Sequence, residues 1–264
     1  MGRELRRKKE RNKLLKKKKK ITEYPEDVLI VHYSCESFYK ITDGRTPRVT
    51  SIAIRNLESA QTESFSIHKV AEQCQIPFDQ ITEKYDQLEK QMLEEYFAYL
   101  QENSSKTWVH WNMRDTTYGF FAIEHRLKAL AGTPVQLPES KKLDLGRGLV
   151  TIYGKNYTPH PRLETLIAKN EITNMAFLGG AEEAEAFENK EYVKLHQSTL
   201  RKVDILANIF ERVADNTLLT DSKWYEVFGM HPKVVVELIK EHWFYSLLGL
   251  LGLMFGLLRG VGVL

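Results

Sequence analysis

The chain has 264 residues, of which 42% are hydrophobic and 28% are charged, with 15 glycines and 8 prolines. This composition excludes a disordered, collagen-like or low-complexity protein, and the length is sufficient to bury a sizeable core. The formal net charge of +3 hides a polarised distribution, because residues 1–20 contain 12 basic and 2 acidic side chains while the remainder contains 26 basic and 33 acidic ones. Two cysteines, Cys35 and Cys74, are too few for a disulfide framework and are not grouped like zinc ligands, which favours a reducing compartment.

The N-terminal segment of residues 1–20 is strongly basic and ends in five consecutive lysines. Mutual repulsion and the lack of apolar periodicity predict a disordered, solvated arm, or at most a transient helix. Its charge predicts attraction to the phosphates of nucleic acid or of anionic lipid, while a solubilising or localisation tail is the alternative. The candidate nucleic-acid-binding residues of this arm are Lys16, Lys17, Lys18, Lys19 and Lys20.

Residues 21–220 are expected to form one α/β domain in which strands come first and helices follow. A mixed sheet with flanking helices accounts for this order. The acidic stretch 181–191 is expected to be a solvated insertion without chemistry. The expected strands cover residues 28–34, 48–57, 63–68, 108–111 and 142–145, and the expected helices cover residues 79–102, 116–130, 162–169 and 200–213.

Polar and acidic side chains stand at three points of this pattern. Ser34 and Glu36 are two residues apart at the end of the first strand, so their side chains share one face. Asn112 and Asp115 follow the strand 108–111, and Asp204 lies inside the last helix. Carboxylates are the ligands that hard divalent cations prefer. As alternatives, Glu36 also fits a solvated strand-end carboxylate, and Asp115 also fits a helix N-cap.

The order of these elements, with the motifs VHYSCESF, WNMRD and LHQSTLRKVDILANIF, resembles the DnaQ-like (DEDD) 3′–5′ exonucleases over roughly residues 27–215. The resemblance implies an RNase H-like mixed sheet with flanking helices. It also implies that Glu36, Asp115 and Asp204 are catalytic and hold Mg²⁺ or Mn²⁺ ions, and that Asn112 contacts nucleic acid.

The sequence departs from this family at two points. Ser34 stands where the family has a carboxylate, and a serine hydroxyl does not replace a carboxylate that bridges two dications. Thr199 and Leu200 stand where the family has its general base, and neither abstracts a proton near neutral pH. His196 is the remaining candidate for a catalytic base, two helical turns before Asp204. The resemblance therefore implies a degenerate active site.

The C-terminal residues 243–264 are predominantly apolar, carry no charged side chain apart from Arg259, and are about long enough to cross a bilayer core as a helix. They predict a single-pass transmembrane segment after a linker helix at residues 221–242, with the folded domain on the cytoplasmic side. A buried core helix is the alternative. A small-residue face that would pair such helices is formed by Gly249, Gly252 and Gly256.

Three functions are consistent with these features. The first is a membrane-tethered nucleic-acid-binding protein with a degenerate exonuclease-like domain, acting as a defence or sensor component. The second is an active Mg²⁺- or Mn²⁺-dependent 3′–5′ exonuclease. The third is a membrane-perturbing, toxin-like effector whose tail assembles with further copies and is controlled by the soluble domain or by a protein partner. The relative positions of Ser34, Glu36, Asp115 and Asp204 distinguish them.

Overall fold

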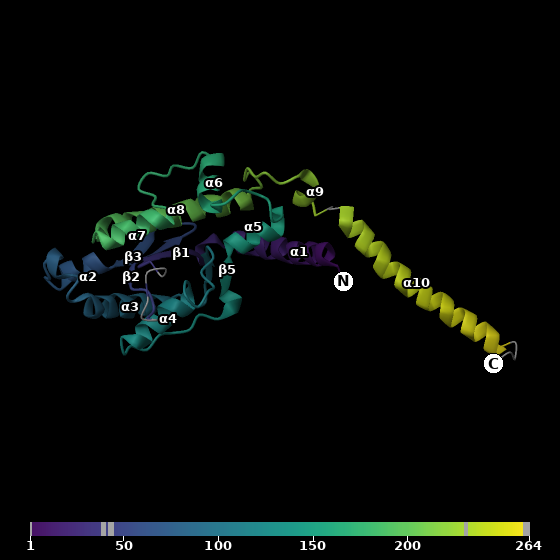
Figure 1. The fold of residues 1–264 in the computed structure, drawn as a ribbon, viewed down its shortest axis with the longest axis horizontal. Helices are drawn as coiled ribbons and strands as arrows, with labels where there is room; N and C mark the ends of the chain where they lie inside the picture. Colours follow the sequence, from purple (N-terminus) through teal and green to yellow (C-terminus); the bar gives the residue numbers. More distant parts are fainter. Residues whose placement is uncertain (1, 38–40, 42–44, 230–231, 261–264) are drawn as a thin grey trace.

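The computed structural model describes residues 2–37, 41, 45–229 and 232–260. Its centre is a mixed five-stranded sheet with the strand order β3-β2-β1-β4-β5 (Figure 1). β1 pairs with β2 antiparallel and with β4 parallel, β2 pairs with β3 antiparallel, and β4 pairs with β5 parallel. The strands are β1 (Val28–Cys35), β2 (Val49–Asn56), β3 (Thr62–Ser66), β4 (Thr107–His110) and β5 (Lys142–Asp144).

Helices cover both faces of the sheet, with α8 on one side and α3 and α4 on the other (Figure 1). The α-helices are α1 (Arg3–Thr22), α2 (Ile67–Gln73), α3 (Tyr85–Glu102), α4 (Phe120–Ala129), α5 (Leu145–Tyr153), α6 (Arg162–Lys169), α7 (Gly180–Glu188), α8 (Tyr192–Ala214), α9 (Trp224–Val227) and α10 (Pro232–Gly260). Short 3₁₀ turns cover Pro25–Asp27, Phe78–Gln80 and Glu139–Lys141.

The central strand β1 is buried on both faces, which explains its apolar and β-branched sequence. Alternate side chains of a strand point to opposite faces. Accordingly, Leu29 and Val31 pack into a core with α2, α3 and α4, whereas Val28 and Ile30 pack into a second core with α5, α6 and α8. The pairing of β1 with β2 shifts register between Ser34 and Cys35, and such irregularities bend a strand. This places a kink directly before Glu36.

The basic N-terminal segment, expected to be a disordered arm, is helix α1 in the structure. Leu5 and Ile21 are buried, and Leu14 packs against the second core. The Nζ atom of Lys18 donates to the carbonyl oxygens of Val213 at 3.1 Å and of Ala214 at 3.0 Å, at the C-terminal end of α8. These few apolar anchors and the cation at a helix C-terminus hold the segment on the domain despite its charge.

The structure contradicts the predicted transmembrane helix. Within the described ranges, no helix is long and apolar enough to cross a membrane. Helix α10 starts at Pro232, so its first turns include Lys233, Glu237 and Lys240, and Arg259 follows the 16 uncharged residues 243–258. A span needs about 20 predominantly apolar residues. Residues 261–264, which completed the expected span, lie outside the described part of the chain, and α10 shows no break between the expected linker and the tail.

Candidate functional site

A cavity of about 570 Å³ opens at the carboxyl ends of β1 and β4. Open α/β sheets commonly bind ligands at this edge. Its wall comes from the end of β1, the turn after β4, the start of α7 and one turn of α8. The lining residues are His32, Tyr33, Cys35, Glu36, Ser37, Asn112, Asp115, Thr117, Tyr118, Gly180, Glu183, Ala184 and Lys202.

Three of the residues predicted from sequence line this cavity together: Glu36, Asn112 and Asp115. They meet because β1 and β4 are adjacent and parallel, so the segments that follow both strands leave the same edge of the sheet. Ser34 is buried beside them, with its hydroxyl 2.8 Å from that of Thr199.

Asp204 lies elsewhere. It lines a different cavity and pairs with Arg55 at 3.0 Å and with Arg201 at 3.7 Å. The reason is the phase of α8, because residues 202 and 204 are about 200° apart around a helix. Lys202 therefore faces the cavity at the strand edge, and the carboxylate of Asp204 points away from it.

His196 is also separate from this cavity. Its ring lies 5.0 Å from that of His68, and its Nε2 atom is 3.1 Å from the Ser64 hydroxyl. Burial, followed by the neighbouring charges of His68 and Lys69, lowers the pKa of His196 to about 4. His196 thus packs over β3 and is not positioned as a base for Glu36 or Asp115.

The carboxylate of Glu36 is engaged by an arginine. The two terminal guanidinium nitrogens of Arg45, Nη1 and Nη2, each donate to it at 2.6 Å, and the backbone N–H of Arg48 donates at 3.3 Å. Such a bidentate pair is among the stronger polar contacts in proteins. Glu36 is therefore an ion-paired carboxylate at the rim of the cavity.

Asp115 is fully exposed in the turn that precedes α4. It is not the N-cap of that helix, since Gly119 occupies the N-cap position. Backbone hydrogen bonds from Thr117 and Thr116 lower the pKa of Asp115. Asp115 thus stabilises its own turn and presents a charged carboxylate to the cavity mouth.

Glu183, which the sequence did not indicate as a site residue, forms the polar centre of the site. Its Oε1 atom accepts from the Ser34 hydroxyl at 2.7 Å and from the Ser198 hydroxyl at 3.2 Å, and it pairs with Lys202 Nζ at 2.7 Å. Glu183 belongs to the acidic stretch that was expected to be a solvated insertion; instead, α7 packs on α8 and β1. A sequence signal existed in α8, where Ser198, Thr199 and Lys202 interrupt an otherwise apolar face.

His32 lines the same cavity and is 7% exposed. Its Nδ1 atom is buried without a hydrogen-bond partner among the described residues. Burial and then the charge of Lys202 hold the pKa of His32 well below its ordinary value, so the ring is neutral at pH 7. This orphaned nitrogen is a polar group available to a bound molecule.

The donor set does not fit Mg²⁺ or Mn²⁺. Glu36 is paired with Arg45, Glu183 is paired with Lys202, and Asp204 is on another face. Across the part of the chain that the structure describes, no three His, Cys, Asp or Glu residues are grouped so that they could hold a metal ion. The two-metal site implied by the exonuclease resemblance is therefore not assembled by these residues.

No protein-family model, curated protein or solved structure significantly matches this chain. The resemblance to DnaQ-like exonucleases accordingly remains a prediction from the motifs.

Proposed function

We propose that the protein binds nucleic acid through helix α1. One observation carries this proposal: five exposed cations lie on one side of α1 while the other side is docked on the domain. This basic stripe consists of Arg6, Lys9, Lys13, Lys16 and Lys20.

The spacing of the basic stripe alternates between three and four residues, which aligns the five side chains along one face of an α-helix. From Arg6 to Lys20 the stripe is about 21 Å long at a rise of 1.5 Å per residue. Nucleic acid is a linear polyanion, and duplex DNA carries about one charge per 1.7 Å of its axis. A straight row of cations on a docked helix therefore suits a phosphate backbone.

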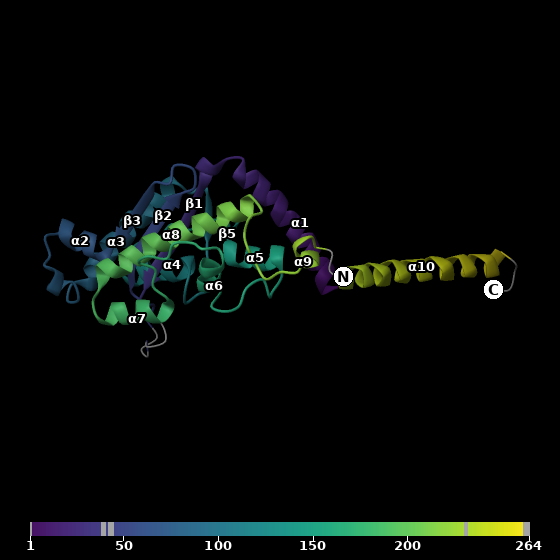
Figure 2. The same ribbon diagram turned by 90° about the horizontal axis from the view of Figure 1, so that it is seen from above.

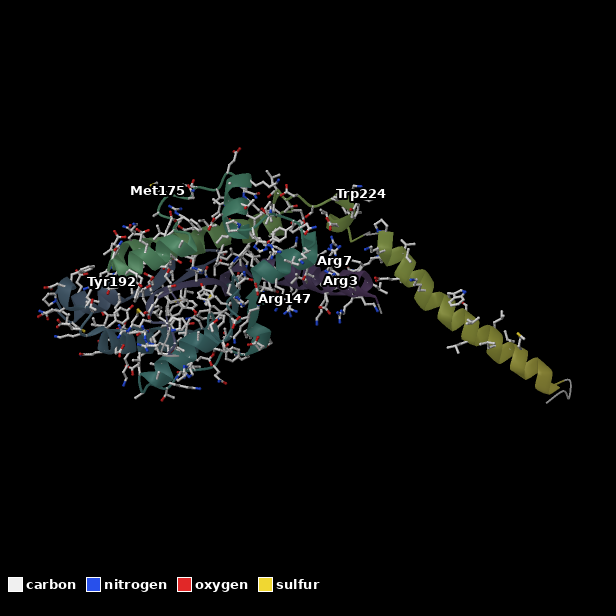
Figure 3. The ribbon with its side chains drawn as sticks, in the orientation of Figure 1. Arg3, Arg7, Arg147, Met175, Tyr192 and Trp224 are labelled. Atoms are coloured by element: carbon white, nitrogen blue, oxygen red, sulfur yellow. The ribbon has the colours of Figure 1, made fainter. Side chains whose placement is uncertain are left out.

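Not all of the lysines predicted from sequence face solvent. Lys16 and Lys20 belong to the stripe and Lys19 lies exposed at its edge, whereas Lys17 is half-buried. Lys18 donates hydrogen bonds to carbonyl oxygens at the C-terminal end of α8, and burial lowers the pKa of Lys18. Figure 3 shows Arg3 and Arg7 at the end of α1 beside the start of α10.

The test compares two variants with the same change of charge. In the stripe variant, Arg6, Lys9, Lys13, Lys16 and Lys20 are replaced by Gln. In the control, five exposed lysines elsewhere are replaced by Gln: Lys84, Lys128, Lys155, Lys190 and Lys194. Anisotropy of labelled single-stranded and duplex oligonucleotides is measured from 50 to 200 mM salt without divalent cations.

Five phosphate contacts predict that the affinity of the native chain falls roughly 100- to 500-fold over this salt range. We expect the stripe variant to lose most of the binding and of the salt dependence, and the control to retain both. Equal losses in both variants, or binding of anionic lipid vesicles with none of oligonucleotides, would overturn the proposal.

Association with a second copy is a further part of the proposal, supported by α10. Trp243, Leu247, Leu250 and Met254 are 38–63% exposed and follow one another at spacings of four, three and four residues, as in the seam of a paired helix.

We also place the protein in the cytoplasm, as its free thiols at Cys35 and Cys74 support a reducing compartment.

A further inference from the structure

One carboxylate oxygen organises the inner end of the cavity at the strand edge. Glu183 Oε1 accepts from two hydroxyls, Ser34 at 2.7 Å and Ser198 at 3.2 Å, and receives the ammonium group of Lys202 at 2.7 Å. The Ser34 hydroxyl is in turn 2.8 Å from that of Thr199. The oxygen is thus surrounded by three donors from β1 and α8 and holds α7 against both.

The side chain of Lys202 is buried beside Glu183. It is 5% exposed, and its Nζ atom also lies 5.3 Å from the centre of the Phe177 ring. A buried ammonium group needs a carboxylate partner, and Glu183, whose side chain is 15% exposed, supplies it. Each group therefore satisfies the other inside the protein.

The charges of the cavity are balanced in the same way at its rim. Arg45 neutralises Glu36, and Lys202 neutralises Glu183. Asp115 is then the one lining carboxylate for which the described residues provide no ionic partner. A single exposed carboxylate is a poor site for a hard dication, which prefers several oxygen ligands.

We propose that Lys202 is the resident cation of this cavity: its ammonium group occupies the place that a divalent ion would otherwise take beside Glu183, and it makes the site independent of divalent cations. Removing that ammonium group leaves Glu183 surrounded by the hydroxyls of Ser34 and Ser198. These are oxygen ligands only, so the variant cavity acquires affinity for a hard cation. This inference concerns α7, α8 and β1 and does not depend on nucleic-acid binding by α1.

The experiment measures Mn²⁺ binding to the full chain by the loss of the free-ion electron paramagnetic resonance signal, together with thermal stabilisation by Mn²⁺. Six variants are compared with the native protein: Lys202→Met; Lys202→Met with Ser34→Asp; Lys202→Met with Glu183→Gln; Lys194→Met as the control; and the single variants Glu183→Gln and Glu36→Gln, which test whether any binding by the native chain uses these carboxylates. Lys194 is an exposed lysine of the same helix, paired with Glu191 at 2.9 Å.

We expect Lys202→Met to bind Mn²⁺ at least about tenfold more tightly than the native chain does, because a carboxylate loses its internal counter-ion. Adding Ser34→Asp places a second carboxylate at the same point and strengthens binding further. Adding Glu183→Gln abolishes the gain, and Lys194→Met leaves the native behaviour unchanged.

Two results would overturn the inference. The first is native binding of Mn²⁺ that Glu183→Gln or Glu36→Gln removes, since the site would then already accept a dication. The second is a folded Lys202→Met variant, with or without Ser34→Asp, that gains no Mn²⁺ affinity. Where Lys202→Met is unfolded by circular dichroism, recovery of its fold by Mn²⁺ supports the inference and failure to recover contradicts it.

Discussion

Glu89 shows how this protein keeps charge inside its core. Its side chain is 0% exposed, and its carboxylate accepts from the backbone N–H of Val49 at 2.7 Å. Arg126 donates to it from Nε at 3.0 Å and from a terminal nitrogen at 2.7 Å, and also reaches Asp86 at 2.8 Å. The pair links α3 to α4 and to the start of β2, so the charge is fully compensated where it is buried.

Breaking this pair on one side is therefore expected to be costly. Arg126→Met leaves the Glu89 carboxylate buried without its cation, which we expect to lower the free energy of unfolding by about 3–5 kcal/mol. The double variant Glu89→Gln with Arg126→Met removes both charges and keeps an acceptor for Val49, so it should regain most of that loss. Urea unfolding of the three proteins measures the difference, and equal destabilisation of the single and double variants would contradict the explanation.

His196 is expected to make the protein sensitive to mild acid. Its pKa is lowered to about 4 in the fold, against an ordinary value of 6.5, so the unfolded chain binds its proton first. Stability should thus be unaffected above pH 6.5 and fall as the pH decreases from 6.5 to 4, by at most about 3 kcal/mol from this residue. Urea unfolding at pH 7 and pH 5 should show a smaller loss in His196→Gln than in the native chain. The exposed His125→Gln serves as the control and should show the native loss.

At the scale of single elements, α1 shows how a charged segment becomes part of the domain (Figure 2). Leu14 lies over a small apolar pocket formed by α5 and α8, which includes Leu149 and Phe210. Leu14→Asp would place a charge there at a cost of about 2 kcal/mol, enough to detach a marginal helix. Asn12→Asp adds the same charge on the exposed face of α1 and serves as the matched control.

We expect hydrogen exchange within residues 3–22 to accelerate in Leu14→Asp and to stay near the native rate in Asn12→Asp. Oligonucleotide affinity should fall in both because each adds a negative charge, but more in Leu14→Asp, where the basic stripe loses its fixed alignment. Fast exchange of α1 already in the native chain would show that the helix is not held by these contacts.

The helices also explain what the sequence could and could not predict. The motif resemblance implied that Glu36 and Asp115 share a site, and the structure brings both to one cavity because β1 and β4 are parallel neighbours whose ends lie at the same edge of the sheet. The direction of Asp204 depends on the rotational phase of α8, which an apolar pattern defines only to within about one residue, or 100°. The sequence could not place Glu183, because a short acidic helix such as α7 has the same composition as a solvated loop. In addition, the chain reverses its direction between α7 and α8, and the sequence does not reveal this reversal.

At the scale of the whole molecule, helix α10 exposes apolar side chains that the rest of the described chain does not cover. The helix extends away from the α/β body (Figure 1), and the side chains of α10 that Figure 3 draws beyond its first turns stand clear of that body. Near its start, the Glu237 carboxylate accepts from the backbone N–H of Leu5 at 2.7 Å and of Glu4 at 3.3 Å, while Val234 is buried. The helix is thus anchored to α1 at one end, and the larger apolar surface at the other end is without a partner in the described single chain.

We expect this surface to pair with the same surface of a second copy. Large exposed apolar patches are rare on monomers. The stripe formed by Trp243, Leu247, Leu250 and Met254 also has no charge that would repel the same stripe of a second copy. Sedimentation of the native chain should give a dimer or a larger closed assembly at micromolar concentration. Leu247→Lys with Leu250→Lys places charges in the stripe and should give monomers.

The control is Leu248→Lys, which alters an exposed leucine about 100° or more away from the stripe, toward Gly252. If the stripe of Trp243, Leu247, Leu250 and Met254 forms the contact between the two copies, the Leu248→Lys variant stays associated. Dissociation by Leu248→Lys alone would instead place the contact on the glycine side, where Gly249 and Gly252 have no atom within 4 Å of an added Cβ. A native chain that remains monomeric at 50 µM or so would contradict pairing through either face, since α10 would then stay exposed in spite of about 0.8 kcal/mol gained for each buried methylene.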